Sequence, residues 1–223
     1  MVESEIQGTA SAGLEQKSLA YKAKASLGDG DLSYPLFSEK PLSNYMSIVG
    51  RNSGQDFNAT MFRDAMVSSL IRDLSDVEGM ITPTTIDMQA YRPAVTYLNG
   101  EYYGITNLRE RTDRRYIEAN YGLDKNQIDL LENDVEIKEG DLDAWNDLLS
   151  LIRNNDISSD DNFATLASMV DVENYTDYLA FQVFIDNTDW PGNNTRRWRE
   201  RSEDGKWRWM LYDLDFTFGL NTL

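Results

Sequence analysis

An Asn-Gly pair at residues 99–100 stands between two runs rich in β-branched and aromatic residues, YRPAVTYL and EYYGITNLRE. The tightest hairpin turns need positive φ at both central residues, a conformation that asparagine and glycine adopt more readily than other residues. The flanking runs have the composition of strands. The sequence therefore predicts an antiparallel hairpin over 91–110, so at least part of this chain must form a sheet.

Other segments carry helical or alternating patterns. Apolar residues recur at spacings of three and four in four places. We expect helices over residues 59–73, 141–153, 163–170 and 172–185. Asn58 suits the N-cap of the first helix. Alternation predicts short strands at 18–24 and 207–211, whereas the charge-dense segment 132–143 is expected to be a solvated connection.

Composition restricts the chemistry. The chain has 223 residues and contains neither cysteine nor histidine. Disulfides, thiol nucleophiles, zinc sites built on these residues and Ser-His-Asp arrangements are therefore excluded. Catalysis would have to use carboxylates, lysine, tyrosine or a hard oxygen-bound metal such as magnesium.

The charge restricts the partners. With 38 acidic and 21 basic residues, the formal charge is −17, which repels nucleic acid and anionic membrane surfaces. We expect neither as a partner, although a nucleotide bound with a divalent metal stays compatible with this charge. The sequence has no run of about 20 apolar residues that could span a membrane. Its first residues also lack the pattern of a secretion signal.

The segment FIDNTDWPGNNTRRW, residues 184–198, is unusually polar and turn-prone. Pro191 and Gly192 favour a turn that folds Asp189 and Asn194 toward one point. A turn of this composition is also common on ordinary protein surfaces. The segment is therefore either a surface loop or a place where oxygen ligands converge.

A second acidic pair, Asp213 and Asp215, follows the predicted strand at 207–211. Two residues apart on a strand, both carboxylates would project from the same face. An aspartate, an asparagine five positions later and an aspartate after a later strand form the set with which protein kinases supply a catalytic carboxylate and two magnesium ligands. A metal-dependent phosphoesterase could use similar carboxylates.

Five blocks of sequence, in order, resemble the CotH family of atypical, kinase-like proteins of bacterial spore coats and secreted proteins. The blocks are EQKSLAYKAKASLGDGDLSYPLF, RNSGQDFNATMFRDAM, YLNGEYYGITNLRERTD, DNTDWPGNNTRRWR and GKWRWMLYDLDFTFG. The resemblance implies an α+β, protein-kinase-like fold that binds ATP with Mg²⁺ or Mn²⁺. It also implies a kinase that phosphorylates Ser or Thr of a protein substrate, located in a spore coat or outside the cell.

The resemblance also implies roles for the acidic residues. Asp189 corresponds to the catalytic carboxylate and Asn194 to a metal ligand, with Asn193 as its substitute. Asp213 or Asp215 corresponds to the metal-binding acid. We favour Asp213 because it follows the apolar strand more closely, and Asp215 would bind a second metal or orient the first.

A lysine that contacts ATP and a glutamate partner are implied as well. Lys17 is our first choice of lysine, with Lys22 and Lys24 as alternatives, and Glu110 is the expected partner. For each of them, a solvated surface charge is an equally good interpretation.

Two arginines are further candidates for cofactor binding. Arg51 and Arg109 would either steady phosphates, since a guanidinium suits bidentate oxygen contacts, or bridge two parts of the fold.

We expect one domain over 1–223, β-rich with one helix over 1–110 and helical with the two acidic loops over 111–223. Relative to the family pattern, the chain is expected to be truncated at the C-terminus. Gln7 and Ala12 stand where the family usually carries arginines. The alternative function is therefore a catalytically inactive scaffold or surface-binding module of the same fold.

Overall fold

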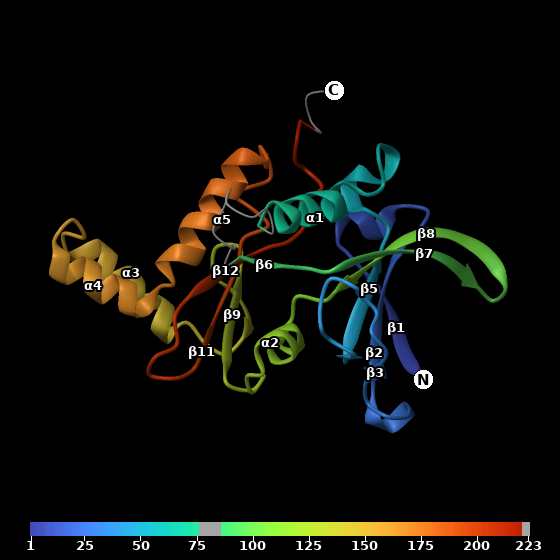
Figure 1. Ribbon diagram of the computed structural model, residues 1–223, viewed down its shortest axis with the longest axis horizontal. Helices are drawn as coiled ribbons and strands as arrows, with labels where there is room; N and C mark the ends of the chain where they lie inside the picture. Colours follow the sequence, from blue (N-terminus) through green and yellow to red (C-terminus); the bar gives the residue numbers. More distant parts are fainter. Residues whose placement is uncertain (76–85, 220–223) are drawn as a thin grey trace.

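The computed structural model describes residues 1–75 and 86–219. Within these residues the chain is a mixed α/β protein with two five-stranded sheets, seen on the two sides of Figure 1. The first sheet is antiparallel throughout, in the order β1-β2-β5-β8-β7. Its strands are β1 (Val2–Gln7), β2 (Ser18–Ala23), β5 (Ser47–Arg51), β7 (Tyr91–Leu98) and β8 (Glu101–Glu110).

The expected hairpin is confirmed. Strands β7 and β8 pair antiparallel up to Leu98 and Glu101, and Asn99 and Gly100 between them have φ values of 52° and 86°. These values are those of a turn with two left-handed residues.

The second sheet has the order β10-β9-β11-β12-β6. Its strands are β6 (Asp87–Met88), β9 (Ile128–Glu132), β10 (Glu136–Glu139), β11 (Arg196–Glu200) and β12 (Arg208–Leu211). Four of the five described α-helices do lie over 111–223, but so do four strands of this sheet, of which only 207–211 was expected. The expectation of a simple connection over 132–143 is wrong, because β10 lies there. Charged residues made these strands hard to predict from sequence. For example, β11 reads RRWRE, and its arginines are paired with acids or carbonyls of neighbouring segments. Strand β6 also joins this sheet from before residue 110 by parallel pairing with β12.

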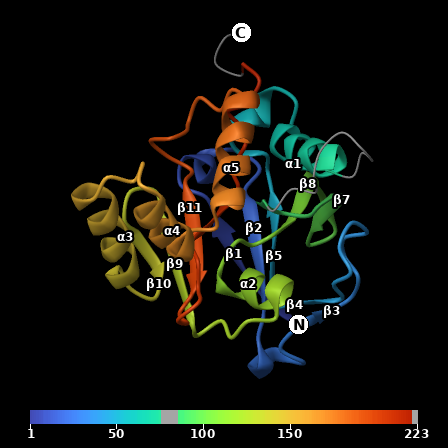
Figure 2. The ribbon, with the colours of Figure 1, turned by 60° about the vertical axis from the view of Figure 1, so that its left-hand side comes forward.

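The helices are α1 (Arg63–Ser75), α2 (Arg114–Tyr121), α3 (Asp143–Asn154), α4 (Asp160–Met169) and α5 (Val172–Phe184). The last three confirm the expected helices, with boundaries shifted by up to three residues, and α2 was not predicted. Figure 2 shows α3, α4 and α5 in front of the second sheet. Shorter elements are the 3-10 helices η1 (Ala10–Gly13), η2 (Ala25–Leu27) and η3 (Gly54–Asn58), with strands β3 (Leu32–Ser33) and β4 (Asn44–Tyr45).

Helix α1 begins four residues later than expected, because Asp56 rather than Asn58 organises its start. The buried Asp56 carboxylate accepts hydrogen bonds from the backbone N–H groups of Thr60 and Arg63, at 3.2 and 3.0 Å. Between them Met61 has φ of 64°, which is incompatible with a continuous helix. The carboxylate thus satisfies N–H groups at the helix entry that would otherwise lack partners.

The main core lies where α1, α3 and α5 pack on the second sheet. Its fully or nearly buried members are Val67, Ile71, Ile86, Leu131, Leu148, Val170, Tyr178, Ile185, Trp207, Trp209, Leu211 and Leu214. The buried amide of Asn174 joins α5 to β12, since it both donates to Trp209 O and accepts from Trp209 N. This packing fixes the ends of α5 and β12, from which the two acidic loops leave. Among the described helices, none combines the length and apolarity needed to cross a membrane.

The core can be tested with a matched pair at the end of α5. Ile185 is 0% exposed and Val183 is 72% exposed. Ile185→Ala should lower the free energy of unfolding by about 2–5 kcal/mol, because it leaves a cavity in the core. Val183→Ala should change it by less than about 0.5 kcal/mol. Urea unfolding followed by tryptophan fluorescence gives both values, and equal effects would contradict the packing described.

Candidate active site

The two acidic loops meet. Asp189 Oδ2 accepts hydrogen bonds from the side-chain amides of Asn193 and Asn194, at 2.9 and 2.7 Å. The Asn194 amide also lies 3.4 Å from the backbone oxygen of Asp213. The backbone N–H of Asn193 donates to Asp189 O at 3.0 Å, which closes the expected turn. The structure thus brings Asp189 and Asn194 to the second acidic pair.

Asp213 and Asp215 do not sit on a strand, contrary to expectation. Strand β12 ends at Leu211, and Asp213 has φ of 57°. This left-handed residue ends the alternation of a strand, so the two carboxylates lie together for a different reason. Arg51 Nη2 contacts both of them, at 2.5 Å from Asp213 Oδ1 and 3.7 Å from Asp215 Oδ2.

The segment after β5 forms the other wall around Asp215. The backbone N–H of Gln55 donates to Asp215 Oδ2 at 2.8 Å. Gly54, with φ of 57°, lies so close that a Cβ atom there would be 2.2 Å from the same oxygen. Only glycine permits both this conformation and this approach.

Asp64, in the first turn of α1, ties these parts together. Its Oδ1 accepts from the backbone N–H of Leu214 at 3.1 Å. Its Oδ2 accepts from Arg51 Nη1 and Arg109 Nη1, at 2.9 and 2.8 Å. Burial opposes ionisation, but the two guanidinium groups and this backbone bond hold the pKa of Asp64 below its ordinary value. Asp64 was not among the residues predicted for the site, although an acid in the first turn of a helix is a recognisable signal.

The environment of Asp215 has the opposite effect. Burial, with the neighbouring charge of Asp213, raises the pKa of Asp215 to about 7 despite the opposing influence of Arg51. An ionised pair of carboxylates at this place is therefore costly unless positive charge is close.

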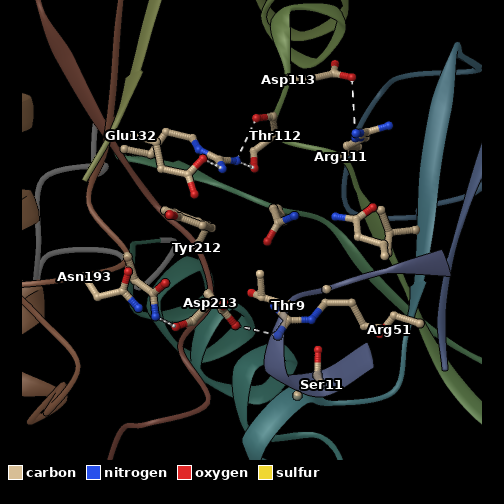
Figure 3. A pocket seen from close by; sticks show the side chains of 18 of the residues that line it. Thr9, Ser11, Arg51, Arg111, Thr112, Asp113, Glu132, Asn193, Tyr212 and Asp213 are labelled. Atoms are coloured by element: carbon tan, nitrogen blue, oxygen red, sulfur yellow. Dashed lines mark hydrogen bonds and ion pairs between the residues drawn. The ribbon is translucent and has the colours of Figure 1, made fainter. Parts of the chain in front are cut away.

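A cavity of about 800 Å³ opens between the two sheets at these residues. The first sheet contributes the loop between β1 and β2 and the end of β5, and the second sheet contributes β9, β10 and β11. Figure 3 shows Arg51 and Asp213 joined across the cavity, with Thr9 and Ser11 beside Arg51. Residues 7–11 of this loop, QGTAS, line the cavity. The sequence had pointed to this stretch only through Gln7 and Ala12, which stand in place of the family's arginines.

The cavity is far less acidic than the whole protein. Its basic lining residues are Lys22, Arg51, Arg111, Arg115, Lys138 and Arg196. Its acidic ones are Asp113, Glu132, Glu136, Glu139, Asp189, Asp213 and Asp215. These six cations and seven anions nearly cancel, whereas the chain carries −17. One divalent cation would make the cavity net positive, which suits a polyphosphate.

Two predicted cofactor-binding residues lie elsewhere. Lys17 is absent from the cavity lining, and its Nζ donates to the backbone oxygens of Ala12 and Leu14 at 2.7 and 2.5 Å. Glu110 is buried outside the cavity, where Lys40 Nζ pairs with it at 2.5 Å. The expected pair of Lys17 with Glu110 is therefore not formed. Sequence alone could not reveal Lys40 as the partner, because the two residues meet only through the fold.

The other predicted cations also differ in whether they reach the cavity. Lys22 lines the cavity and pairs with Glu5 at 2.5 Å, whereas Lys24 pairs with Glu3 and is half-exposed. Arg109 is fully buried, with its guanidinium on Asp64, Ser68 and the Ala90 carbonyl. Arg109 thus bridges parts of the fold and cannot reach a ligand, while Arg51 reaches the cavity.

The residues present fit a magnesium or manganese ion. The Asn194 amide nitrogen is engaged by Asp189 and Asp213, which leaves its Oδ1 as the atom for a metal. Together with the carboxylates of Asp213 and Asp215 this gives hard oxygen donors only, the type that both ions prefer. Among residues 1–75 and 86–219, no three carboxylates converge to hold a metal without such an amide.

Two acidic loops that present an aspartate, an amide and two further aspartates to a cavity between sheets are typical of enzymes that act on phosphates with a bound metal. The family model described as CotH kinase protein matches residues 5–222. The chain belongs to the CotH kinase family. Comparison with curated proteins gives no match.

The contact at Gly54 gives a prediction. Gly54→Ala should push Asp215 and Gln55 apart and lower the free energy of unfolding by about 1–3 kcal/mol, since it adds both a clash and left-handed strain. Gly13→Ala is the control, because nothing lies within 4 Å of its Cβ position. Chemical denaturation compares the two variants, and equal stability of both would contradict the close approach.

The raised pKa of Asp215 predicts a pH dependence. The folded protein keeps this proton up to about pH 7, whereas an unfolded aspartate loses it near about pH 4. Between these values the folded state binds more protons, so rising pH must lower the free energy of unfolding. In EDTA, wild-type protein should lose stability relative to Asp215→Asn across this window. A constant difference between the two would refute the assignment.

Proposed function

We propose that this protein is an atypical protein kinase that transfers the γ-phosphate of ATP to Ser or Thr of a protein substrate. The observation that carries this proposal is the convergence of Asp189 and Asn194 with Asp213 at one edge of the cavity. These residue types, from two loops distant in sequence, form the set that phosphoryl transfer needs.

Asp189 is the group that would bind the hydroxyl of the acceptor and take its proton. Both amide contacts use its Oδ2 atom, which orients the carboxylate and leaves Oδ1 for a hydroxyl proton. Asp189 also lines the cavity, so an acceptor serine or threonine can reach it. A positioned carboxylate contributes to such a transfer mainly by orienting the hydroxyl and accepting its proton.

Asn194, Asp213 and Asp215 would hold the divalent ion. When bound, Mg²⁺ or Mn²⁺ neutralises the phosphates and fixes their orientation. Asp64 and the Gln55 N–H keep the loop that carries Asp213 and Asp215 in place, through Leu214 and Asp215. The protein's own contribution is therefore largely to hold these oxygens in a preorganised position.

The triphosphate would lie toward the loop between β1 and β2. Residues 7–11 and Arg51 line this side of the cavity, and Gly8 has φ of 109°, a conformation that lets the backbone turn sharply. The volume of about 800 Å³ is within the range of pockets that enclose small-molecule ligands of this size. Lys22 would take the role first given to Lys17, because it lines the cavity and lies on β2, the strand that Lys17 immediately precedes.

An Asp189→Asn variant tests the proposal. The amide keeps the shape of Asp189 but cannot take a proton, so phosphate incorporation should fall by about 100-fold or more. The assay uses γ-labelled ATP with Mg²⁺ or Mn²⁺ and dephosphorylated casein as acceptor. Asp186→Asn is the matched control, because Asp186 is exposed three residues away and does not line the cavity.

Each outcome has a distinct meaning. Equal incorporation by wild type and Asp189→Asn would reject the role of Asp189. If wild type incorporates nothing, thermal unfolding with ATP and metal separates the remaining possibilities. Saturating nucleotide, at about 100 times its dissociation constant, should add roughly 2.7 kcal/mol of stability. If wild type shows no activity and nucleotide does not stabilise it, the inactive scaffold is favoured.

A further inference from the structure

We propose that Arg51 is a built-in counter-cation that occupies the metal-binding carboxylates and has to leave them before a divalent ion can bind. The inference rests on the proposed function of this site, since it concerns how the same carboxylates exchange one positive charge for another. It makes Arg51 a positioning residue that couples metal binding to phosphate binding.

The contacts of Arg51 carry the first step. Its Nη2 atom lies 2.5 Å from Asp213 Oδ1 and 3.7 Å from Asp215 Oδ2, so one nitrogen serves both carboxylates. The arginine side chain is only 16% exposed and that of Asp215 only 4%. Two partly buried carboxylates this close repel each other strongly, and a guanidinium between them offsets that repulsion.

Competition for the same atoms carries the second step. A magnesium ion needs ligand oxygens at about 2.0–2.1 Å in a nearly octahedral arrangement. The Asp213 oxygen that faces Arg51 already shares one lone pair with Nη2, so a metal that takes its other lone pair would lie close to the guanidinium. A divalent ion beside an unmoved guanidinium would also meet like-charge repulsion in a partly buried place.

Asp64 determines how Arg51 can move. Arg51 Nη1 is held 2.9 Å from Asp64 Oδ2, and Asp64 is itself fixed by Arg109 and the Leu214 N–H. The guanidinium can therefore pivot about Nη1, which stays bound to Asp64, and this movement takes Nη2 away from Asp213. That rotation can go toward the cavity, which Thr9 and Ser11 line together with Arg51; Figure 3 shows both residues beside Arg51.

The exchange has a thermodynamic consequence. In the absence of nucleotide, moving Arg51 away from Asp213 and Asp215 gives up these two ion pairs, so metal binding alone is weakened. A bound polyphosphate offers anionic oxygens on the cavity side, which suit a guanidinium. Metal and nucleotide should therefore raise each other's affinity by the same factor, and Arg51 should supply much of that factor.

Binding of Mn²⁺ without nucleotide tests the exchange, with free Mn²⁺ measured by electron paramagnetic resonance at about pH 8, where carboxylates are ionised. Arg51→Gln keeps a donor for Asp64 but removes the charge, so its Mn²⁺ affinity should rise about tenfold or more over wild type. Arg51→Lys keeps a cation and should stay nearer to wild type. Arg111→Met is the matched control, because Arg111 lines the cavity but pairs with Glu5 and Asp113.

The same titrations with ADP present complete the test. ADP should raise the Mn²⁺ affinity of wild type and of Arg111→Met, and should raise that of Arg51→Gln much less. Equal Mn²⁺ affinities of wild type and Arg51→Gln without ADP, including no binding by either, would overturn the inference. If wild-type protein binds Mn²⁺ but transfers no phosphate, the proposed function is overturned and the inference about Arg51 is not.

A measurement on wild type covers the case in which Arg51→Gln does not fold. Nitrogen-15 spectra of arginine side chains, assigned with Arg51→Lys, report the hydrogen bonds of the Arg51 guanidinium. Mg²⁺ with ADP should shift the Arg51 resonance and leave that of the buried Arg109 unchanged. An unmoved Arg51 resonance at saturating Mg²⁺ and ADP would show that the guanidinium does not leave Asp213.

Discussion

The site depends on one buried carboxylate, that of Asp64. It accepts hydrogen bonds from Arg51, Arg109 and the backbone of Leu214, and so joins the first sheet, α1 and the loop of Asp213 and Asp215. A buried carboxylate is costly on its own, and two guanidinium groups with a backbone N–H offset that cost. The same three bonds fix the distance between the wall that carries Arg51 and the loop that carries the metal ligands.

Backbone conformation also holds the two acidic loops in place. Asn194 and Asp213 have φ values of 54° and 57°. Asparagine and aspartate tolerate this left-handed region better than most residues, and such strain is commonly found at functional sites. The bond from the Asn194 amide to the Asp213 carbonyl, with that of the Thr188 N–H to Phe216 O, holds the two loops in this arrangement. The oxygens of the site are thereby placed before any ligand arrives.

Much of the fold could be predicted where one local pattern dominates. The Asn99-Gly100 turn and the amphipathic segments that became α3, α4 and α5 were found because turn chemistry and helical spacing act over a few residues. Strands β9 and β11 were missed because paired charges on them obscure the alternation. Strand β6 could not be found, since its two residues become a strand only through pairing with β12.

The sequence by itself determined which chemistry is open to this protein. The lack of cysteine and histidine left carboxylates, lysine, tyrosine or an oxygen-bound metal for catalysis, and the turn around Pro191 placed Asp189 beside Asn194. Only the tertiary structure decided which cations serve the site. Arg51, not Lys17, reaches the acids, and Glu110 pairs with Lys40. The physical reason is range, because the type of a side chain and a local turn are encoded over a few residues. The choice between similar charges depends on contacts between segments up to 162 residues apart.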